Sequence, residues 1–543
     1  MVLASLLLAS AMRADLDAVL NHTDLAGALV GACVMRQDGT VLYERNPDAR
    51  MVPASNQKLL ACAFALDRLG PDWKPKTEFW KEADAVVVRT TGDPMATYAD
   101  WRAVGAKLGV PSGTAFRVAQ PFDPAVPPSW EWDDLPNKYA ARVASLTVDR
   151  GSFELWGGPA GLELRPSDYG VRIVHFDQSG PARVRYEPHV GVCFVSGTLP
   201  DKATRLDTLA LPDPTLAAVK AMGGGSWTAT VSVPDRKPDL VVEGRPIREI
   251  VAGCLPPSDN NLAEALVLLG SAGGASGGRV GYGDVSREMR AFVRKAIGDA
   301  AFRPDDGSGM SRHNIVTARG LAQLLVWAGK QPWASVYFEN MAAPGRGTLA
   351  SRLAGSTFRG KTGTLDMVSS LSGIVDVKGE RLAVSLLMNH YACPAARARA
   401  LQDAFIGTLE RGTLPGNDTG IPWNRAYSPA EQLLRAPLRG DLGSHSHLVA
   451  VFSGTNRRVQ PIDASPVATG RGHLRGGQGP HPVGGVVRVG RARPPRPGDG
   501  DALLQRDRFG VPMLLVGRRG VRLGQTHPEP EALSPKHGRA ATL

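Results

Sequence analysis

The chain is 543 residues long, which is enough for more than one folded domain. Its 43% hydrophobic and 21% charged residues are typical of a globular protein. The net charge of +11 suggests a nucleic-acid ligand, but +9 of it lies between Leu414 and Leu543, where 17 Arg and 1 Lys face 9 acidic residues. The remaining residues are nearly neutral, so we expect no nucleic-acid partner.

Residues 15–72 predict a helix, a hairpin that turns at 37–39, and a second helix. Residues 73–243 contain short apolar strands between Pro and Gly turns, which indicate a β-rich insertion. The strands expected there are 84–90, 142–149, 171–176, 190–197 and 227–233. Helical patterning returns in residues 244–412, followed by three strands (356–365, 369–377 and 381–389) and a last helix at 393–410.

These elements predict an α/β (α+β) fold with helices around an antiparallel sheet. Residues 15–72 and 244–412 would form one discontinuous domain, interrupted by the insert at 73–243. Residues 413–543 are rich in Arg, Gly and Pro, and we expect them to be mostly disordered because little apolar surface offsets the entropy of ordering. Their charge favours loose contact with anionic polymers of the cell envelope, which salt would weaken.

The N-terminus contains a short apolar run that ends in Ala-Ser-Ala at 9–11, which resembles the end of a secretory signal. We therefore interpret residues 1–14 as the remnant of a signal peptide and expect an exported protein. The alternative is that these residues begin the first helix of the fold. No apolar run is long enough to span a membrane.

The five cysteines are scattered and form no Cys-x-x-Cys pair, so we expect no zinc site. No other pattern indicates a metal or a cofactor. Cys62 and Cys254 lie in apolar, helix-like surroundings and are predicted to be core residues.

Ser55 and Lys58 stand where the second predicted helix begins. On a helix, residues three apart lie on one face. A serine hydroxyl needs a base, and a lysine that is desolvated and crowded by another cation is neutral enough to act as one. We place Ser55 at the capping position, where its backbone N–H faces a developing oxyanion. Alone, the pair is weak evidence, because a capping serine beside a solvated lysine has the same spacing.

A second motif, Ser258-Asp259-Asn260, lies in the loop that opens a later helix. The Ser258 hydroxyl would relay a proton, and the Asn260 amide would hold both a substrate carbonyl and a lysine. Alone, this motif is better explained by a Ser or Asp helix cap followed by a turn asparagine.

The third motif is Lys361-Thr362-Gly363, on a predicted strand. The cation and the hydroxyl suit a substrate carboxylate, and Gly363 lets a substrate backbone lie against the strand. The backbone N–H of Thr364 would be the second oxyanion donor.

The three motifs occur in the order S-x-x-K, S-D-N and K-T-G that marks penicillin-binding proteins and class A β-lactamases. The chain resembles the class C low-molecular-mass penicillin-binding proteins, the D-alanyl-D-alanine carboxypeptidase/endopeptidase family. The likeness covers about residues 15–412 and includes the long insert after Ser55, which ordinary β-lactamases lack. It also includes the segments TGDPMAT (91–97), PSWEWDDLPNKYAARVASLTVD (128–149), DGSGMSRHN (306–314) and GRGTLASRL (345–353).

The resemblance implies a penicillin-recognising serine transpeptidase-like fold and an acyl-enzyme on Ser55. Lys58 would accept its proton, while Lys361 would keep Lys58 partly neutral by repulsion and anchor the substrate carboxylate. The implied substrates are peptidoglycan stem peptides that end in D-Ala-D-Ala, or crosslinks, with β-lactams as inhibitors. The alternatives are a β-lactamase or esterase of the same fold, and a non-catalytic wall-binding protein.

Overall fold

The computed structural model describes residues 2–412 except 123–124, 167–168, 274–278 and 299–300, together with residues 414, 504–506 and 512–514. The chain divides into two compact units, Met1–Ala436 and Pro437–Leu543. The described residues of the second unit form an antiparallel pair of short strands, β17 (Leu504–Arg506) and β18 (Pro512–Leu514). The predicted disorder of residues 413–543 otherwise lies outside the described residues.

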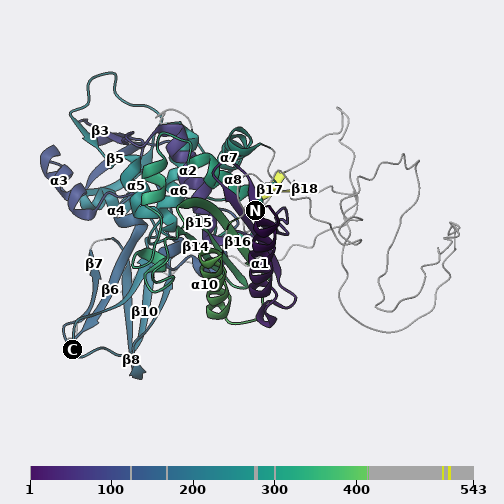
Figure 1. Ribbon diagram of the computed structural model, residues 1–543. Coiled ribbons are helices and arrows are strands. Elements are labelled where there is room, and N and C mark those ends of the chain that lie inside the picture. Colours follow the sequence, from purple (N-terminus) through teal and green to yellow (C-terminus); the bar gives the residue numbers. More distant parts are fainter. Residues whose placement is uncertain are drawn as a thin grey trace, which may run out of the picture. The chain divides into compact units, whose positions relative to one another are not determined.

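The first unit contains a five-stranded antiparallel sheet in the order β14-β15-β16-β1-β2 (Figure 1). Its strands are β1 (Leu29–Arg36), β2 (Val41–Arg45), β14 (Arg359–Leu365), β15 (Val368–Val377) and β16 (Glu380–Asn389). β1 pairs with β16 along its whole length, from Leu29 opposite Asn389 to Arg36 opposite Leu382. The predicted hairpin and the predicted meander are therefore confirmed, and they meet in one sheet.

Helices cover both faces of this sheet. In β1, Val30, Ala32 and Val34 face a core shared with α1 (Val2–Leu20) and α10 (Ala395–Arg411), whereas Cys33 and Met35 face the opposite helical layer. This alternation is what a strand buried on both sides requires. The helical layer consists of α2 (Gln57–Leu69), α5 (Ile247–Cys254), α6 (Asn260–Ala272), α7 (Tyr282–Ile297), α8 (Ala318–Ala328) and α9 (Ala334–Glu339).

Helix α1 runs without a break through residue 14, the predicted end of a signal peptide. Met12, Leu16 and Leu20 are buried against the sheet. Residues from Met12 onward therefore contribute to the core, while the export of the chain stays a prediction. Cys62 and Cys254 are fully buried, as predicted. Within the described residues, no helix is both long and apolar enough to cross a bilayer.

The insert has a hydrophobic core of its own, built from residues between Phe79 and Val242. Three sheets surround it, in the orders β12-β5-β4-β3-β13, β8-β10-β9 and β11-β6-β7. The strands are β3 (Lys76–Lys81), β4 (Ala85–Thr90), β5 (Thr114–Ala119), β6 (Ser152–Gly158), β7 (Gly161–Arg165), β8 (Arg172–Pro181), β9 (Arg183–Glu187), β10 (Val192–Thr198), β11 (Thr204–Ala210), β12 (Gly224–Ala229) and β13 (Leu240–Glu243).

Two helices in the insert were not predicted, α3 (Tyr98–Leu108) and α4 (Pro214–Ala221). They explain why β4 and β5, and also β5 and β12, run parallel, since parallel neighbours need a long connection. The sequence carried a signal for α3, because Thr97 and Asp100 form a capping box at its start.

The predicted strand at 142–149 is wrong, because this segment is an irregular connection. Its apolar side chains, including Leu146 and Val148, are buried as a strand's would be. Its carbonyl groups, however, accept side-chain donors: Trp101 Nε1 bonds the Thr147 oxygen at 2.6 Å, and Thr215 Oγ1 bonds the Leu146 oxygen at 2.9 Å. Apolar alternation predicted the burial correctly, but not the hydrogen-bond partners.

We predict that Leu16→Ala lowers the free energy of unfolding by about 2–5 kcal/mol, because it removes a fully buried side chain between α1 and the sheet. Urea unfolding measures the change. Asp15→Ala, at the exposed neighbouring position, is the control and should stay within about 0.5 kcal/mol of the parent. Equal stability of both variants would mean that α1 is not part of the folded body.

Candidate active site

Ser55 lies in a 3-10 turn, Ala54–Asn56, directly before α2. The prediction that Ser55 caps the helix is wrong: Asn56 occupies the cap position and makes no side-chain capping bond. Ala54 adopts a left-handed backbone with φ of 46°, a costly conformation for a residue with a Cβ. Gly309 packs so closely over it that a Cβ there would lie 1.8 Å from the Ala54 oxygen. This turn leaves the Ser55 hydroxyl available to another partner.

That partner is Lys58. Its Nζ lies 2.8 Å from Ser55 Oγ, 2.6 Å from Asn260 Oδ1 and 2.7 Å from the Ser308 carbonyl oxygen. The two carbonyl-type oxygens can only accept hydrogen bonds, so each requires an N–H of the lysine. A neutral amine has two N–H groups and one lone pair, and with both N–H groups engaged, the lone pair faces the serine hydroxyl. With Lys58 neutral, these contacts would leave its lone pair for the Ser55 hydroxyl, and the same distances fit an ammonium that donates to all three oxygens.

Both lysines of the motifs are fully buried. Burial is the main cause that lowers the pKa of Lys58 and that of Lys361. Repulsion from Lys58 lowers the pKa of Lys361 further. Of the two predicted causes of a partly neutral Lys58, desolvation is the leading one, and repulsion by Lys361 is not among the main causes of its lowered pKa. Burial thus disfavours the charged form of the amine next to Ser55.

The Asn260 side chain is held in one orientation from two sides. Its Nδ2 donates to the Tyr139 carbonyl of the insert at 2.8 Å, which leaves Oδ1 for Lys58. Asp259 caps α6 by accepting from Leu262 N at 3.0 Å and so fixes the residue before it. Ser258 has φ of 64° and is half-buried. In the described part of the chain, its hydroxyl makes no hydrogen bond, so the structure brings Asn260, but not Ser258, into contact with Lys58.

The third motif lies on β14, an edge strand of the central sheet. A Cβ on Gly363 would lie 2.9 Å from Ser55 N and 2.2 Å from Ser370 Oγ, so only glycine permits this approach to the nucleophile. Thr362 Oγ1 bonds Thr348 Oγ1 at 2.8 Å, and Thr364 is exposed. β14 thus places Lys361 to Thr364 alongside Ser55, with the edge of the sheet available to a ligand.

The sequence interpretation missed Glu264, which is fully buried on α6. Its carboxylate accepts from Gly307 N at 2.9 Å and from Ser308 N at 2.7 Å, and so holds the loop whose Ser308 carbonyl binds Lys58. The signal was present, because Glu264 is the one charged residue in the apolar helix 260–272. Burial and the nearby Asp306 raise the pKa of Glu264 to about 8.

The same loop is fastened by Asp306, which is also fully buried. Its Oδ1 accepts from Gly309 N and Asn314 Nδ2, each at 2.7 Å, and its Oδ2 accepts from Trp130 Nε1 of the insert at 3.0 Å. The insert therefore supports two walls of the site, through Tyr139 and Trp130. Among the described residues, no three His, Cys, Asp or Glu side chains gather as a metal ion needs.

Comparison with known proteins identifies the family. Residues 12–411 match the model of the D-Ala-D-Ala carboxypeptidase 3 (S13) family. The chain belongs to this family. It is 30% identical over 459 residues to the D-alanyl-D-alanine carboxypeptidase of an Actinomadura species (strain R39), covering 73% of this chain and 84% of that protein. It is 24% identical over 426 residues to carboxypeptidase DacB of Mycolicibacterium smegmatis, covering 73% and 82%.

Among solved structures, the chain is similar to penicillin binding protein 4 (dacB) of Haemophilus influenzae, with a TM-score of 0.60 and 17% identity. The match covers 72% of this chain and 97% of that one, and confirms the predicted fold. The family confirms the resemblance drawn from the motifs: the chain is a serine peptidase that acts on peptidoglycan. The non-catalytic alternative is thereby set aside.

We predict that Glu264→Gln changes the pH dependence of stability. Because the pKa of Glu264 is raised from 4.5 to about 8, the unfolded chain ionises first as pH rises, and the parent loses stability between these values. Gln cannot ionise, so the variant's free energy of unfolding relative to the parent should rise from pH 5 to pH 8 by more than about 1 kcal/mol.

Urea unfolding at both pH values measures this change, with Glu249→Gln at an exposed position of α5 as the control. A relative stability that falls with pH would show that Glu264 is charged in the folded protein.

Proposed function

We propose that this peptidase releases the terminal D-Ala of stem peptides, or cleaves crosslinks, through an ester on Ser55. The observation that carries the proposal is the buried Lys58 amine, 2.8 Å from Ser55 Oγ, with both of its N–H groups directed to carbonyl oxygens. A general base for serine needs contact with the hydroxyl and a pKa near the working pH, and burial shifts the Lys58 pKa in that direction.

In the acylation step, Ser55 Oγ attacks the carbonyl carbon of the penultimate D-Ala while its proton passes to Lys58. The backbone N–H groups of Ser55 and Thr364 stabilise the oxyanion. Collapse of the tetrahedral intermediate breaks the peptide bond, and the leaving amine takes the proton back. Water then attacks the ester and regenerates Ser55. Ser258 acts as proton relay once the substrate fills the space beside it.

Lys361 and Thr362 bind the terminal carboxylate. An anion beside the fully buried Lys361 favours its charged form, which offsets the burial that lowers its pKa. The stem peptide adds to the edge of β14 as an extra strand, with Gly363 permitting close approach. β-Lactams offer the same carbonyl and carboxylate and become trapped as the Ser55 ester. Because the polymer lies outside the cytoplasm, the function requires export.

We predict that penicillin forms a stable adduct on the parent protein and none on Ser55→Ala. Mass spectrometry of the intact protein and of its peptides measures the adduct and its position. Ser351→Ala, at an exposed serine, should react like the parent. An adduct that vanishes within seconds would instead favour the β-lactamase alternative, and labelling of Ser55→Ala would remove Ser55 from the mechanism.

We predict that Lys58→Arg slows acylation at least about 10³-fold in the fraction of the variant that folds. Arginine offers the N–H donors that Asn260 and Ser308 require, but it does not release a proton at ordinary pH. Stopped-flow or quenched acylation measures the rate, with Lys330→Arg on the surface as the control. A rate within about tenfold of the parent would leave Lys58 a purely electrostatic role.

A further inference from the structure

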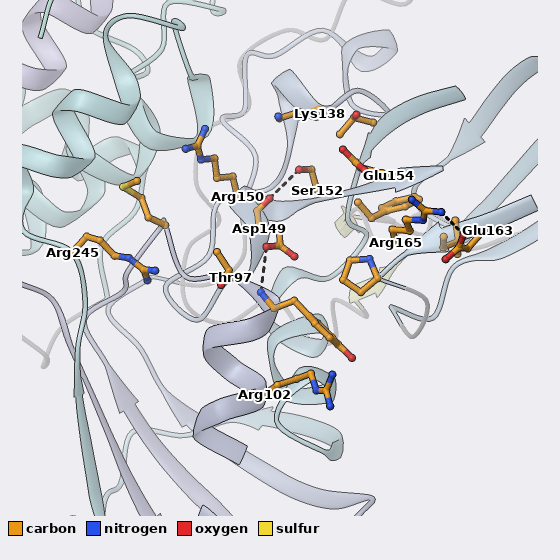
Figure 2. A pocket seen from close by; sticks show the side chains of 16 residues that line it. Thr97, Arg102, Lys138, Asp149, Arg150, Ser152, Glu154, Glu163, Arg165 and Arg245 are labelled. Carbon is orange, nitrogen blue, oxygen red and sulfur yellow. Dashed lines mark hydrogen bonds and ion pairs between the residues drawn. The ribbon is translucent and has the colours of Figure 1, made fainter. Parts of the chain in front are cut away.

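A second cavity, of about 850 Å³, opens in the insert, away from the motif residues (Figure 2). It is bounded by α3, β6, β7 and the 3-10 turn before β6. Its lining residues are Met95, Thr97, Tyr98, Arg102, Lys138, Asp149, Arg150, Ser152, Phe153, Glu154, Glu163, Leu164, Arg165, Pro166, Thr208 and Arg245. Half of these side chains are charged, with both signs present, so the cavity suits a charged ligand rather than an apolar one.

Most of the charges are already paired. Arg245 binds Asp93 and Asp100 at 2.9 and 2.7 Å, and Arg165 binds Glu163 at 2.8 Å. In contrast, the side chains of Arg102 and Lys138 are exposed and make no hydrogen bond or ion pair within the described residues. Lys138 interacts electrostatically with Glu154 in the same cavity, but no hydrogen bond occupies its amine, so the two exposed cations are available for two anionic groups of a ligand.

Asp149 supplies the opposite charge. In Figure 2 it lies between Arg102 and Lys138. Its Oδ1 accepts from Tyr98 N at 3.2 Å and its Oδ2 from the Tyr169 hydroxyl at 2.8 Å, which leaves a lone pair on each oxygen. Burial raises the pKa of this carboxyl, so a cationic partner would stabilise its charged form.

We propose that this cavity binds a second, unreacted stem peptide of the substrate polymer, an inference that rests on the proposed function for the identity of the ligand. Carboxylates of the peptide lie at Arg102 and Lys138, and the side-chain amine of its diamino acid lies at Asp149. A polyphosphate has the charge for the two cations, but it would face Asp149, Glu154 and Glu163 without any cation to offer them.

The cavity is connected to Lys58 through two short paths. Arg150 lines it and binds Asp259 at 3.0 Å, the cap of α6, and the next residue is Asn260. Lys138 lines it and precedes Tyr139, whose carbonyl holds the Asn260 amide. Asn260 in turn binds Lys58. A ligand that moves Arg150 and Lys138 toward each other therefore changes the position of Asn260, which orients Lys58.

The turn between the two sites is strained. Asp149, Arg150 and Gly151 have φ of 47°, 57° and 67°, three left-handed residues in succession. Non-glycine residues keep this conformation only when their surroundings impose it. Gly151 packs so tightly that a Cβ there would lie 2.8 Å from the Arg142 oxygen and 3.6 Å from Asn261 Nδ2. A small shift of Asp149 on ligand binding is thus passed to the start of α6.

The first test measures binding of N-acetyl-L-Ala-γ-D-Glu-L-Lys, which carries two carboxylates and one amine and lacks D-Ala-D-Ala. Calorimetric titration uses the full chain after penicillin treatment, with the adduct checked by mass so that a failure of acylation is seen separately. We expect binding, weakened about tenfold or more by Arg102→Gln. Lys107→Gln, on the same helix but outside the cavity, should bind within about twofold of the parent.

The difference in tripeptide affinity between Arg102→Gln and Lys107→Gln locates the binding site in the cavity, whether or not penicillin has acylated Ser55. No binding, or equal loss in both variants, overturns the proposal. Tighter binding of a glycerol phosphate polymer of equal charge overturns the assignment to a peptide.

The second test measures the coupling. Saturating tripeptide should change the rate at which penicillin acylates the parent by about threefold or more, whereas Arg150→Gln, compared with its own rate without tripeptide, should show no change. A parent rate that does not respond to bound tripeptide removes the connection to Asn260.

Discussion

The burial of one amine organises this protein. Lys58 Nζ has no exposed surface, and three protein oxygens surround it. A buried polar group without partners costs several kcal/mol, so the fold must bring acceptors to the lysine from segments distant in sequence. Asn260 comes from α6, and the Ser308 carbonyl comes from a loop that Glu264 and Asp306 hold by their carboxylates. The helical layer is arranged so that these segments converge on one nitrogen.

The insert is part of this arrangement although its core is separate. Tyr139 and Trp130 reach from the insert to Asn260 and Asp306, the two groups that position the acceptors of Lys58. A chain with the same three motifs but without the insert would need other donors and acceptors at these points. The insert therefore supports the geometry around Lys58, as well as carrying the cavity described above.

The sequence predicted what depends on local pattern or on residue type at fixed spacing. The alternation in β1 and β16, the meander, and the motif residues Ser55, Lys58 and Lys361 are of this kind. The sequence-based prediction was wrong where contacts between distant segments determine the backbone conformation. Residues 142–149 have the apolar pattern of a strand, but their carbonyl groups accept hydrogen bonds from side chains such as Trp101 instead of from a neighbouring strand. It also placed Ser55 in the cap, because no local rule reports that Ala54 is left-handed. Glu264 was visible as a lone charge, but its function depends on backbone groups 43 and 44 positions away.

In the described part of the chain, four of the nine non-glycine residues with positive φ lie beside the Lys58 site or on the path to it from the insert. Ala54 precedes Ser55, Ser258 precedes the cap of α6, and Asp149 and Arg150 lie in the turn that Arg150 joins to that cap, all with φ between 46° and 64°. Each such residue costs of order 1–3 kcal/mol, so packing must hold them in place. Gly309 against Ala54 and Gly151 against Arg142 are those contacts, at distances that admit no Cβ. The close packing of Gly309 and Gly151 thus holds the strained residues near Lys58 in their left-handed conformation. A change in the backbone at Asp149 would therefore alter the position of Asn260, which binds Lys58.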